Sequence, residues 1–365
     1  MTDTLWLCRV AGLWAVVLNC CMWGAQPLWG GEPPAVRVTN VRQVFHNGEH
    51  NAFTDLVRFG DRFYLTFRSC PDGHMVHPTA SIIILSSADA QSWEPVHQFR
   101  VAKRDTRDPH FLVFRNRLFV YTGTWYSGET TIAVEDYDLN QHLGYAAWSD
   151  DGRTWHSPVL LEGTFGHYIW RAAAHGDTAY LCGRRKIEFD MAARGEGPAV
   201  ESLMLESTDG LIWRKRAVFQ EQEGDETAFL FEPDGAVLGI GRRGGAAAQF
   251  LRSARPYAHW GRRDLGQQVG GPRLTRWGDF YVVGGRKATA DRGPKTALHW
   301  LIGQQLHEFA ELPSGGDNSY PGFVALSPTR ALVSWYSSHE QDDAGRPITA
   351  IYLALALGAG AFVLF

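Results

Sequence analysis

A short strand-like segment recurs six times along the chain and constrains the fold more than any other feature. Each copy begins at a turn residue and runs into a stretch of aromatic and aliphatic side chains, and four copies end on an arginine. The copies are 61–68, 116–122, 177–184, 235–242, 278–286 and 329–336. They lie roughly 45 to 60 residues apart, a period typical of stacked supersecondary units such as four-stranded propeller blades.

The fourth copy shows the local design most clearly. Phe229 to Phe231 is apolar, Pro233-Asp234-Gly235 is a turn signal, and Ala236 to Ile240 is apolar again. An acid opens the first apolar run, and Arg242 closes the second. We therefore predict a hairpin of two short strands here, and a related hairpin in each of the other copies.

A second pattern, Ser-x-Asp-x-x-x-Trp, lies between the copies at 87–93, 149–155 and 207–213, with Trp260 as a degenerate fourth member. Asp and Ser side chains bond their own backbone in such turns, and Trp packs between sheets. This pattern resembles the Asp-box of the sialidase superfamily, a structural hairpin. The resemblance implies an all-β fold, a six-bladed β-propeller of four-stranded antiparallel blades, and we expect it to span residues 40–357 as one domain.

Composition agrees with this fold and excludes several functions. The 365 residues include 14 Trp, 20 Phe and 39 Gly, which suits a β-rich and turn-rich chain. The net charge of -4 and the absence of a basic run argue against nucleic acid as a partner. No Gly-rich phosphate loop and no metal-ligand spacing occurs, so we expect neither cofactor nor metal, and we expect a monomer.

Both ends of the chain are apolar. Arg9 precedes an apolar stretch, 10–25, with the length of a signal-peptide core, and we expect residues 1–31 to direct secretion or export to the periplasm. The alternatives are a retained anchor, because 17–20 loosely resembles a lipoprotein box, and a misread start. At the other end we expect 348–355 to be the strand that closes the ring rather than a membrane tail, so no integral membrane domain is expected beyond the N-terminal segment.

Polar side chains open the first predicted strand of five blades. Inner strands of a propeller border its central channel, so these side chains should form a ring there. The residues are Asp55, Asp108, Arg171, Glu226 and Tyr320. The alternative is that each bonds to neighbouring backbone in a tight turn.

A second set of candidates follows at the ends of the second strands. Arg68, Arg184, Arg242 and Arg286 recur there, and a guanidinium offers a fork of donors that fits a carboxylate, although salt bridges between blades are the alternative. The loops beyond add His74 and His339 as candidate substrate contacts. Trp125 and Tyr126 are candidates for stacking on a sugar, with packing as the alternative.

The functional resemblance to sialidases rests on Glu226, Arg242, Arg286, Tyr320 and Glu340, which occur in the chain order of the sialidase site. It implies that Tyr320 is a nucleophile with Glu226 as its base, that Arg242 and Arg286 bind the substrate carboxylate, and that Glu340 orients an arginine. A phenol suits this substrate because it approaches an anomeric carbon that bears a carboxylate with less repulsion than a second carboxylate would meet.

The chain departs from sialidases in its first blade. Residues 53–56 carry no arginine where sialidases have one, and Arg68 is the conjectured substitute. The acid/base is not defined by a motif; Asp108 is preferred, then Asp55, with Asp72 as a third candidate. We expect an exo-glycosidase of sialidase type that acts on a terminal acidic sugar. The alternative is a non-catalytic propeller that binds glycans.

Overall fold

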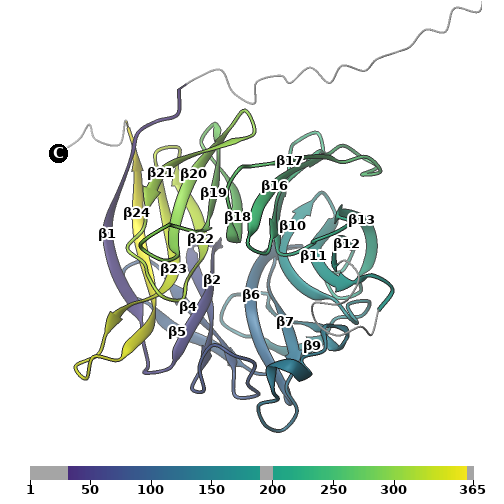
Figure 1. The fold of residues 1–365 in the computed structure, drawn as a ribbon, viewed down its shortest axis with the longest axis horizontal. Coiled ribbons are helices and arrows are strands. Elements are labelled where there is room, and N and C mark those ends of the chain that lie inside the picture. Colours follow the sequence, from purple (N-terminus) through teal and green to yellow (C-terminus); the bar gives the residue numbers. More distant parts are fainter. Residues whose placement is uncertain (1–31, 190–199, 360–365) are drawn as a thin grey trace, which may run out of the picture.

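The computed structural model describes residues 32–189 and 200–359, which form 24 strands and three short 3₁₀ helices. The strands make six four-stranded antiparallel sheets arranged as the blades of a propeller (Figure 1). The predicted six-bladed β-propeller is therefore confirmed. The segment 1–31, for which we expect an export signal, lies outside the described residues. Within the described ranges, no helix has the length and apolar character needed to cross a membrane.

The inner strands of successive blades contact one another in a closed ring around the channel. They are β2 (His50–Phe59), β6 (Arg104–Phe114), β10 (Tyr168–His175), β14 (Thr227–Phe231), β18 (Gly270–Trp277) and β22 (Asn318–Ser327). The second strands coincide with the six sequence copies. They are β3 (Arg62–Cys70), β7 (Arg117–Tyr126), β11 (Thr178–Lys186), β15 (Val237–Arg243), β19 (Phe280–Lys287) and β23 (Arg330–Gln341).

The outer half of each blade is built from two further strands. The third strands are β4 (Ser81–Ser87), β8 (Leu143–Ser149), β12 (Val200–Ser207), β16 (Ala246–Ser253), β20 (Lys295–Ile302) and β24 (Pro347–Gly358). The fourth strands are β5 (Glu94–Phe99), β9 (His156–Leu160), β13 (Arg214–Gln220), β17 (Gly261–Asp264), β21 (Gln305–Glu311) and β1 (Val36–Phe45). The short helices are η1 (Val134–Asp136), η2 (Leu139–Gln141) and η3 (Ile187–Phe189).

Both ends of the described chain meet in the sixth blade. β1 pairs antiparallel with β24 from Val36 opposite Gly358 to Phe45 opposite Ile351, and it forms the outer edge of that sheet. The expected C-terminal strand is present as β24, but it is the third strand of the blade, and the N-terminal strand β1 completes the ring. A sequence repeat locates strands and leaves open which end of the chain supplies the last one.

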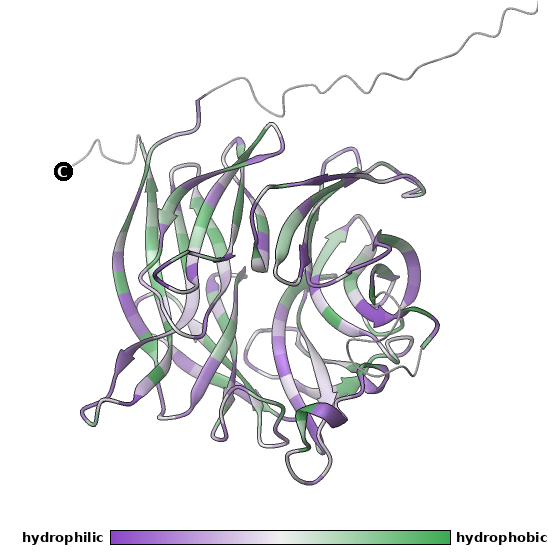
Figure 2. Ribbon diagram, in the orientation of Figure 1, coloured by the Kyte–Doolittle hydropathy of each residue, from purple (hydrophilic) through white to green (hydrophobic). Residues whose placement is uncertain are grey.

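The three Ser-x-Asp-x-x-x-Trp segments form the hairpins between third and fourth strands of blades 1 to 3. In each, one carboxylate oxygen accepts two backbone N–H groups; Asp151 accepts those of Arg153 and Thr154 at 2.8 and 2.7 Å. The tryptophan comes directly before the fourth strand. Buried apolar side chains of the strands pack into clusters between the blades. The ribbon of Figure 2 is coloured as hydrophobic over much of β20 and β24.

The inner strands share an irregularity that positions the site. Five of the six, all except β14, have a register shift against the second strand at the same level, typical of a β-bulge. The first extra residue is Phe53 in β2, Asp108 in β6, and Tyr320 in β22, and each has a positive φ of 63°, 52° and 52° respectively. A bulge redirects a side chain out of the sheet's alternation, and these three side chains all face one cavity.

Candidate active site

A cavity of about 250 Å³ opens at the end of the channel where the inner strands begin. All six blades contribute to its wall, and most of the side chains are charged or aromatic. They are Phe53, His74, Arg107, Asp108, Trp125, Tyr168, Arg184, Glu226, Arg242, Arg286, Asp317, Tyr320 and Tyr336. Eight of the candidate residues from the sequence are in this set: His74, Asp108, Trp125, Arg184, Glu226, Arg242, Arg286 and Tyr320.

A hydrogen bond across the cavity joins the sixth blade to the fourth. Tyr320 Oη donates a hydrogen bond to Glu226 Oε1 at 2.8 Å, and Arg242 Nη1 donates to Glu226 Oε2 at 2.8 Å. Arg242 Nη1 also lies 3.4 Å from Tyr320 Oη. Burial raises the pKa of Tyr320 well above its usual range, and the Glu226 carboxylate raises it further. The phenol therefore keeps its proton at neutral pH and has an acceptor in place to receive it.

Backbone strain and a glycine hold Tyr320 in this position. Tyr320 has a φ of 52°, and Ser319 before it has a φ of 112°. Such conformations cost about 1–3 kcal/mol each and persist where the surrounding structure enforces them. The equivalent bulge in β18 contains Gly271, with φ of 59°, where a Cβ atom would lie 2.6 Å from Tyr320 Cδ2. A glycine is needed there because the tyrosine ring occupies the space of any side chain.

Asp108 is a second carboxyl group in the cavity, and it differs from Glu226 in its charge. Its side chain is 4% exposed; Tyr168 Oη hydrogen-bonds to Oδ2, and Oδ1 is buried without a partner. Burial, reinforced by the charge of Glu226, raises the pKa of Asp108 to about 8. At neutral pH Asp108 is therefore mostly uncharged, whereas Glu226 is paired with Arg242 and the third carboxyl group of the cavity, Asp317, is ionised.

Arginines give the rest of the wall a positive character. Arg286 Nη1 lies 3.3 Å from the carbonyl of Asn318 and 3.6 Å from Asp317 Oδ1. Arg184 Nη1 donates to Asp225 Oδ1 at 2.5 Å. Both side chains line the cavity, and guanidinium groups beside a cavity suit an anionic group of a ligand.

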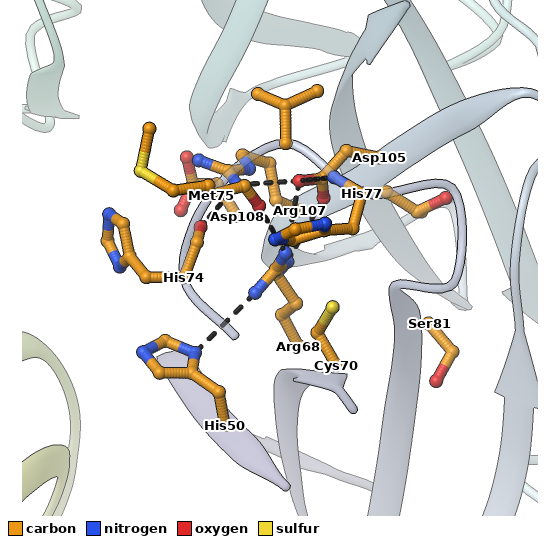
Figure 3. Close-up of polar contacts among 12 residues, drawn as sticks. His50, Arg68, Cys70, His74, Met75, His77, Ser81, Asp105, Arg107 and Asp108 are labelled. Atoms are coloured by element: carbon orange, nitrogen blue, oxygen red, sulfur yellow. Dashed lines mark hydrogen bonds and ion pairs between the residues drawn. The ribbon is translucent and has the colours of Figure 1, made fainter. Parts of the chain in front are cut away.

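Arg68 does not line the cavity, although it was the conjectured substitute for the missing first-blade arginine. It is fully buried and forms a two-pronged ion pair with Asp105, Nε to Oδ1 and Nη2 to Oδ2 both at 3.0 Å (Figure 3). Arg107 Nη2 donates to the same Asp105 Oδ2 at 2.6 Å and does reach the cavity. Arg107, next to Asp108 in the inner strand, was not predicted.

Asp55 and Arg171 lie outside the cavity in the same channel. Arg171 Nη1 donates to Asp55 Oδ1 at 2.7 Å, and the backbone N–H of Phe111 donates to Asp55 Oδ2 at 2.9 Å. Asp55 pairs with Thr66 just after the bulge, whereas Phe53 is the first bulged residue. The sequence alignment placed Asp55 level with Asp108 and Tyr320, but the residue of β2 that is equivalent to these two is Phe53, and Asp55 lies two residues further along the channel.

His339 and Glu340 also lie outside the cavity. His339 Nδ1 is 2.9 Å from Ser337 Oγ, and its Nε2 is 3.8 Å from Glu340 Oε1. The carboxylate beside Arg286 is Asp317, at 3.6 Å, in the role expected of Glu340. Trp125 lines the cavity and Tyr126 does not. Asp317 directly precedes an inner strand, as Asp225 and Glu226 do, and this shared placement is the sequence signal that could have identified it.

His50, His74 and Asp317 are the described residues whose potential metal-ligand atoms lie within 4.8 Å of one another. His50 Nε2 and His74 Nδ1 meet the same Asp317 oxygen at 2.9 and 2.7 Å, which are hydrogen-bond distances. Arg68 Nη1 lies 3.5 Å from His50 Nδ1. Hydrogen bonds within the protein therefore account for this arrangement without an ion.

No family model and no curated protein sequence matches the chain. Among solved structures, it is similar to a protein of unknown function from Dyadobacter fermentans, with a TM-score of 0.72 and 19% identity over 89% of this chain and 100% of that one. It is also similar to Trypanosoma rangeli sialidase in complex with sialic acid, with a TM-score of 0.63 and 12% identity, covering 90% of this chain and 59% of that one. For phage phi92 endosialidase the TM-score is 0.60 at 11% identity, over 87% and 69% of the two chains. The propeller is thus sialidase-like in fold.

Proposed function

We propose that this protein is an exo-glycosidase of sialidase type that hydrolyses a terminal acidic sugar through a tyrosine-linked intermediate. The observation that supports the proposal is the 2.8 Å hydrogen bond from Tyr320 Oη to Glu226 Oε1 within a polar cavity. A phenol is a weak nucleophile while it keeps its proton, and an adjacent base activates it. Glu226 takes the proton as the phenolic oxygen attacks the anomeric carbon.

The arginines support an acidic substrate. Arg242 and Arg286 flank Tyr320 and present donors to the cavity, so a carboxylate on the anomeric carbon would be bound beside the nucleophile. Arg107 supplies a third guanidinium from the second blade, where the first blade has Phe53 and Thr54 in place of an arginine. A cavity of about 250 Å³ suits one sugar residue at the end of a glycan, which favours exo-cleavage.

A propeller that binds such a sugar without turnover is the second candidate. The altered first blade favours it, since Phe53 packs on Tyr320 with ring centroids 4.9 Å apart and places an aromatic ring where sialidases have an arginine. We also propose that the chain acts as an exported monomer on glycans outside the cytoplasm, on the basis of Arg9 and the apolar stretch that follows it.

Hydrolysis of 4-nitrophenyl glycosides of sialic acid and of hexuronic acids by residues 32–365 tests the proposal. We expect turnover of at least one acidic glycoside, and a loss of about 1,000-fold or more in Tyr320→Phe and Glu226→Gln. Phenylalanine fills the same space, so unchanged thermal unfolding serves as the control for folding. Binding of an acidic sugar without turnover by the folded wild-type protein would favour the second candidate and would exclude the glycosidase.

A further inference from the structure

His74 is the titratable cavity residue that lies at the opening, with 45% of its side chain exposed. Asp108, at 4%, lies deep in the wall. Phe53 packs on both His74 and Tyr320, with ring centroids 5.8 and 4.9 Å apart, so one aromatic ring separates the imidazole from the phenol. In exo-cleavage the aglycone leaves through the opening, and a group that protonates its oxygen must lie there.

The loop that carries His74 is fixed by buried charges. Arg68 donates to the carbonyl oxygens of Gly73 and Met75 at 2.9 and 3.0 Å, and Arg107 donates to those of His74 and Met75 at 2.8 and 2.9 Å (Figure 3). Both guanidinium groups are themselves bound by the buried Asp105. Surface loops are usually the mobile parts of a fold, whereas this one is held at three successive carbonyls.

The imidazole ring is oriented as well. Asp317 Oδ2 lies 2.7 Å from His74 Nδ1 and 2.9 Å from His50 Nε2, while Asp317 Oδ1 accepts a hydrogen bond from Tyr336 Oη at 2.9 Å. Burial opposes ionisation of Asp317, but the hydrogen bonds from His50 and His74 hold its pKa far below the usual range. The ionised carboxylate accepts from Nδ1–H of His74, and within the described part of the chain no hydrogen bond occupies His74 Nε2.

We propose that His74 is the acid and base of the reaction at the leaving-group oxygen, and that Asp317 is a positioning residue for it. This inference rests on the proposed glycosidase function. A histidine whose second nitrogen is bound by a carboxylate is a recurring proton-transfer unit in enzymes. Asp108 then acts inside the cavity as an uncharged hydrogen-bond donor to the sugar.

Each proton that is transferred in the first step of the reaction is returned in the second step. In the first half, Glu226 takes the Tyr320 proton, the phenolic oxygen bonds to the anomeric carbon, and the glycosidic C–O bond breaks. Its electron pair stays on the leaving oxygen, which takes the Nε2 proton of the His74 imidazolium. In the second half, water gives a proton to Nε2 and its oxygen attacks the anomeric carbon; the bond to Tyr320 breaks, and the phenolate recovers its proton from Glu226.

Dependence on the leaving group tests this assignment, because a nitrophenolate needs no proton to depart and an alkoxide does. The assay compares kcat/KM for the 4-nitrophenyl and methyl glycosides of the acidic sugar that the wild-type protein hydrolyses. We expect His74→Asn to lose about 100-fold or more on the methyl glycoside and less than about tenfold on the nitrophenyl one. Asp317→Asn should show the same pattern to a smaller degree.

His307→Asn, at an exposed histidine on the outer strand β21 and outside the cavity lining, is the matched control and should leave both rates unchanged. Equal losses of His74→Asn on both glycosides, or the leaving-group pattern in Asp108→Asn in its place, would overturn the assignment and leave the glycosidase standing. Absence of turnover by the folded wild-type protein on every acidic glycoside would overturn both.

Discussion

Single residues in the cavity show how neighbouring carboxyl groups acquire different charges. Glu226 accepts hydrogen bonds from Arg242 and Tyr320, so its negative charge has partners. Asp108 has one hydroxyl partner and an unpartnered oxygen in a buried setting, and the charge of Glu226 disfavours a second negative charge nearby. The difference comes from a guanidinium that reaches one carboxylate and not the other.

Asp108→Asn is expected to change how stability depends on pH. The pKa of Asp108 is about 8 in the folded protein against a usual value of 3.8, so between these values the folded state holds a proton that the unfolded state releases. The contribution of Asp108 is therefore fully present below about pH 4 and is lost as the pH rises through about 8. Urea unfolding of wild-type protein from pH 4.5 to 8.5 should show this decline, and Asp108→Asn should lack it.

Asp55→Asn is expected to change the pH dependence of stability in the opposite direction from Asp108→Asn. Burial opposes ionisation of Asp55, but Arg171 and Arg273 hold its pKa below the usual range, so its contribution is present above about pH 4 and is lost in acid. Removing one partner of this buried ion pair should destabilise the protein by about 3–5 kcal/mol at neutral pH. Equal pH profiles for the two variants would contradict both assignments.

At the scale of elements, the bulges in the inner strands bring side chains of several blades to one cavity. Without a bulge, side chains alternate between the two faces of each strand. The extra residue in β2, β6 and β22 directs Phe53, Asp108 and Tyr320 to a common cavity. In β18 the same bulge carries Gly271, which makes room for Tyr320.

Gly271→Ala should therefore impair the proposed catalysis by displacing Tyr320, the proposed nucleophile. The added methyl group would lie 2.6 Å from Tyr320 Cδ2, and displacement of that ring breaks its alignment with Glu226. We expect a loss of about 100-fold in kcat with about 1–3 kcal/mol of destabilisation. Gly303→Ala is the control, because Gly303 has a φ of 55° and nothing within 4 Å of its added Cβ. It should lose stability through backbone strain alone and keep its activity.

The loop after β3 is the second element that the site requires. Asp105 binds Arg68 and Arg107, and it also accepts the backbone N–H of His77 at 3.1 Å. Asp105→Asn would leave two buried guanidinium groups without their shared counter-charge, and we expect a loss of about 3–5 kcal/mol. Hydrogen exchange should rise first in residues 73–77. Exchange that rises evenly over the whole first blade would show that the loop has no separate dependence on this ion pair.

At the scale of the whole molecule, a propeller is stable only as a closed ring. The chain closes it by adding β1 to the edge of β24, which joins residues near both ends of the described chain in one sheet. An open edge would expose a row of unpaired N–H and C=O groups and the apolar side of β24. The cavity depends on this closure because its wall takes residues from every blade.

Truncation separates the closing strand from the segment before it. A chain that begins at residue 36 keeps β1 and should unfold cooperatively, like one that begins at residue 32. A chain that begins at residue 46 lacks β1, and we expect aggregation or a loss of the cooperative thermal transition. Circular dichroism and size-exclusion chromatography measure both. Equal melting temperatures for the chains that begin at residues 36 and 46 would show that the ring does not need β1.

The sequence by itself determined the architecture, because the period of the second-strand copies and the three Ser-x-Asp-x-x-x-Trp hairpins are local patterns that need no tertiary contact to be recognised. It also predicted that Tyr320, Glu226, Arg242 and Arg286 face the channel, since these open or close strands that end at the same side of the ring, and all four line the cavity. The tertiary structure showed which residues are equivalent: Phe53 in β2 and Asp108 in β6 are the first bulged residues and line the cavity, and Asp55 lies two residues further along the channel. The apolar pattern locates a strand but does not show which of its residues carries the bulge.

The hydrogen-bond and ion-pair partners of the charged side chains were likewise decided only by the tertiary structure. Asp317 lies 243 positions from His74 along the chain and 2.7 Å from it in space, and no spacing rule connects them. Arg68 was a candidate ligand-binding arginine and Arg107 was not, yet Arg68 is bound within the protein by Asp105 and by the carbonyls of Gly73 and Met75, whereas Arg107 lines the cavity. Electrostatic roles depend on which groups exclude water and face each other, and in a ring of six blades those groups come from distant parts of the chain.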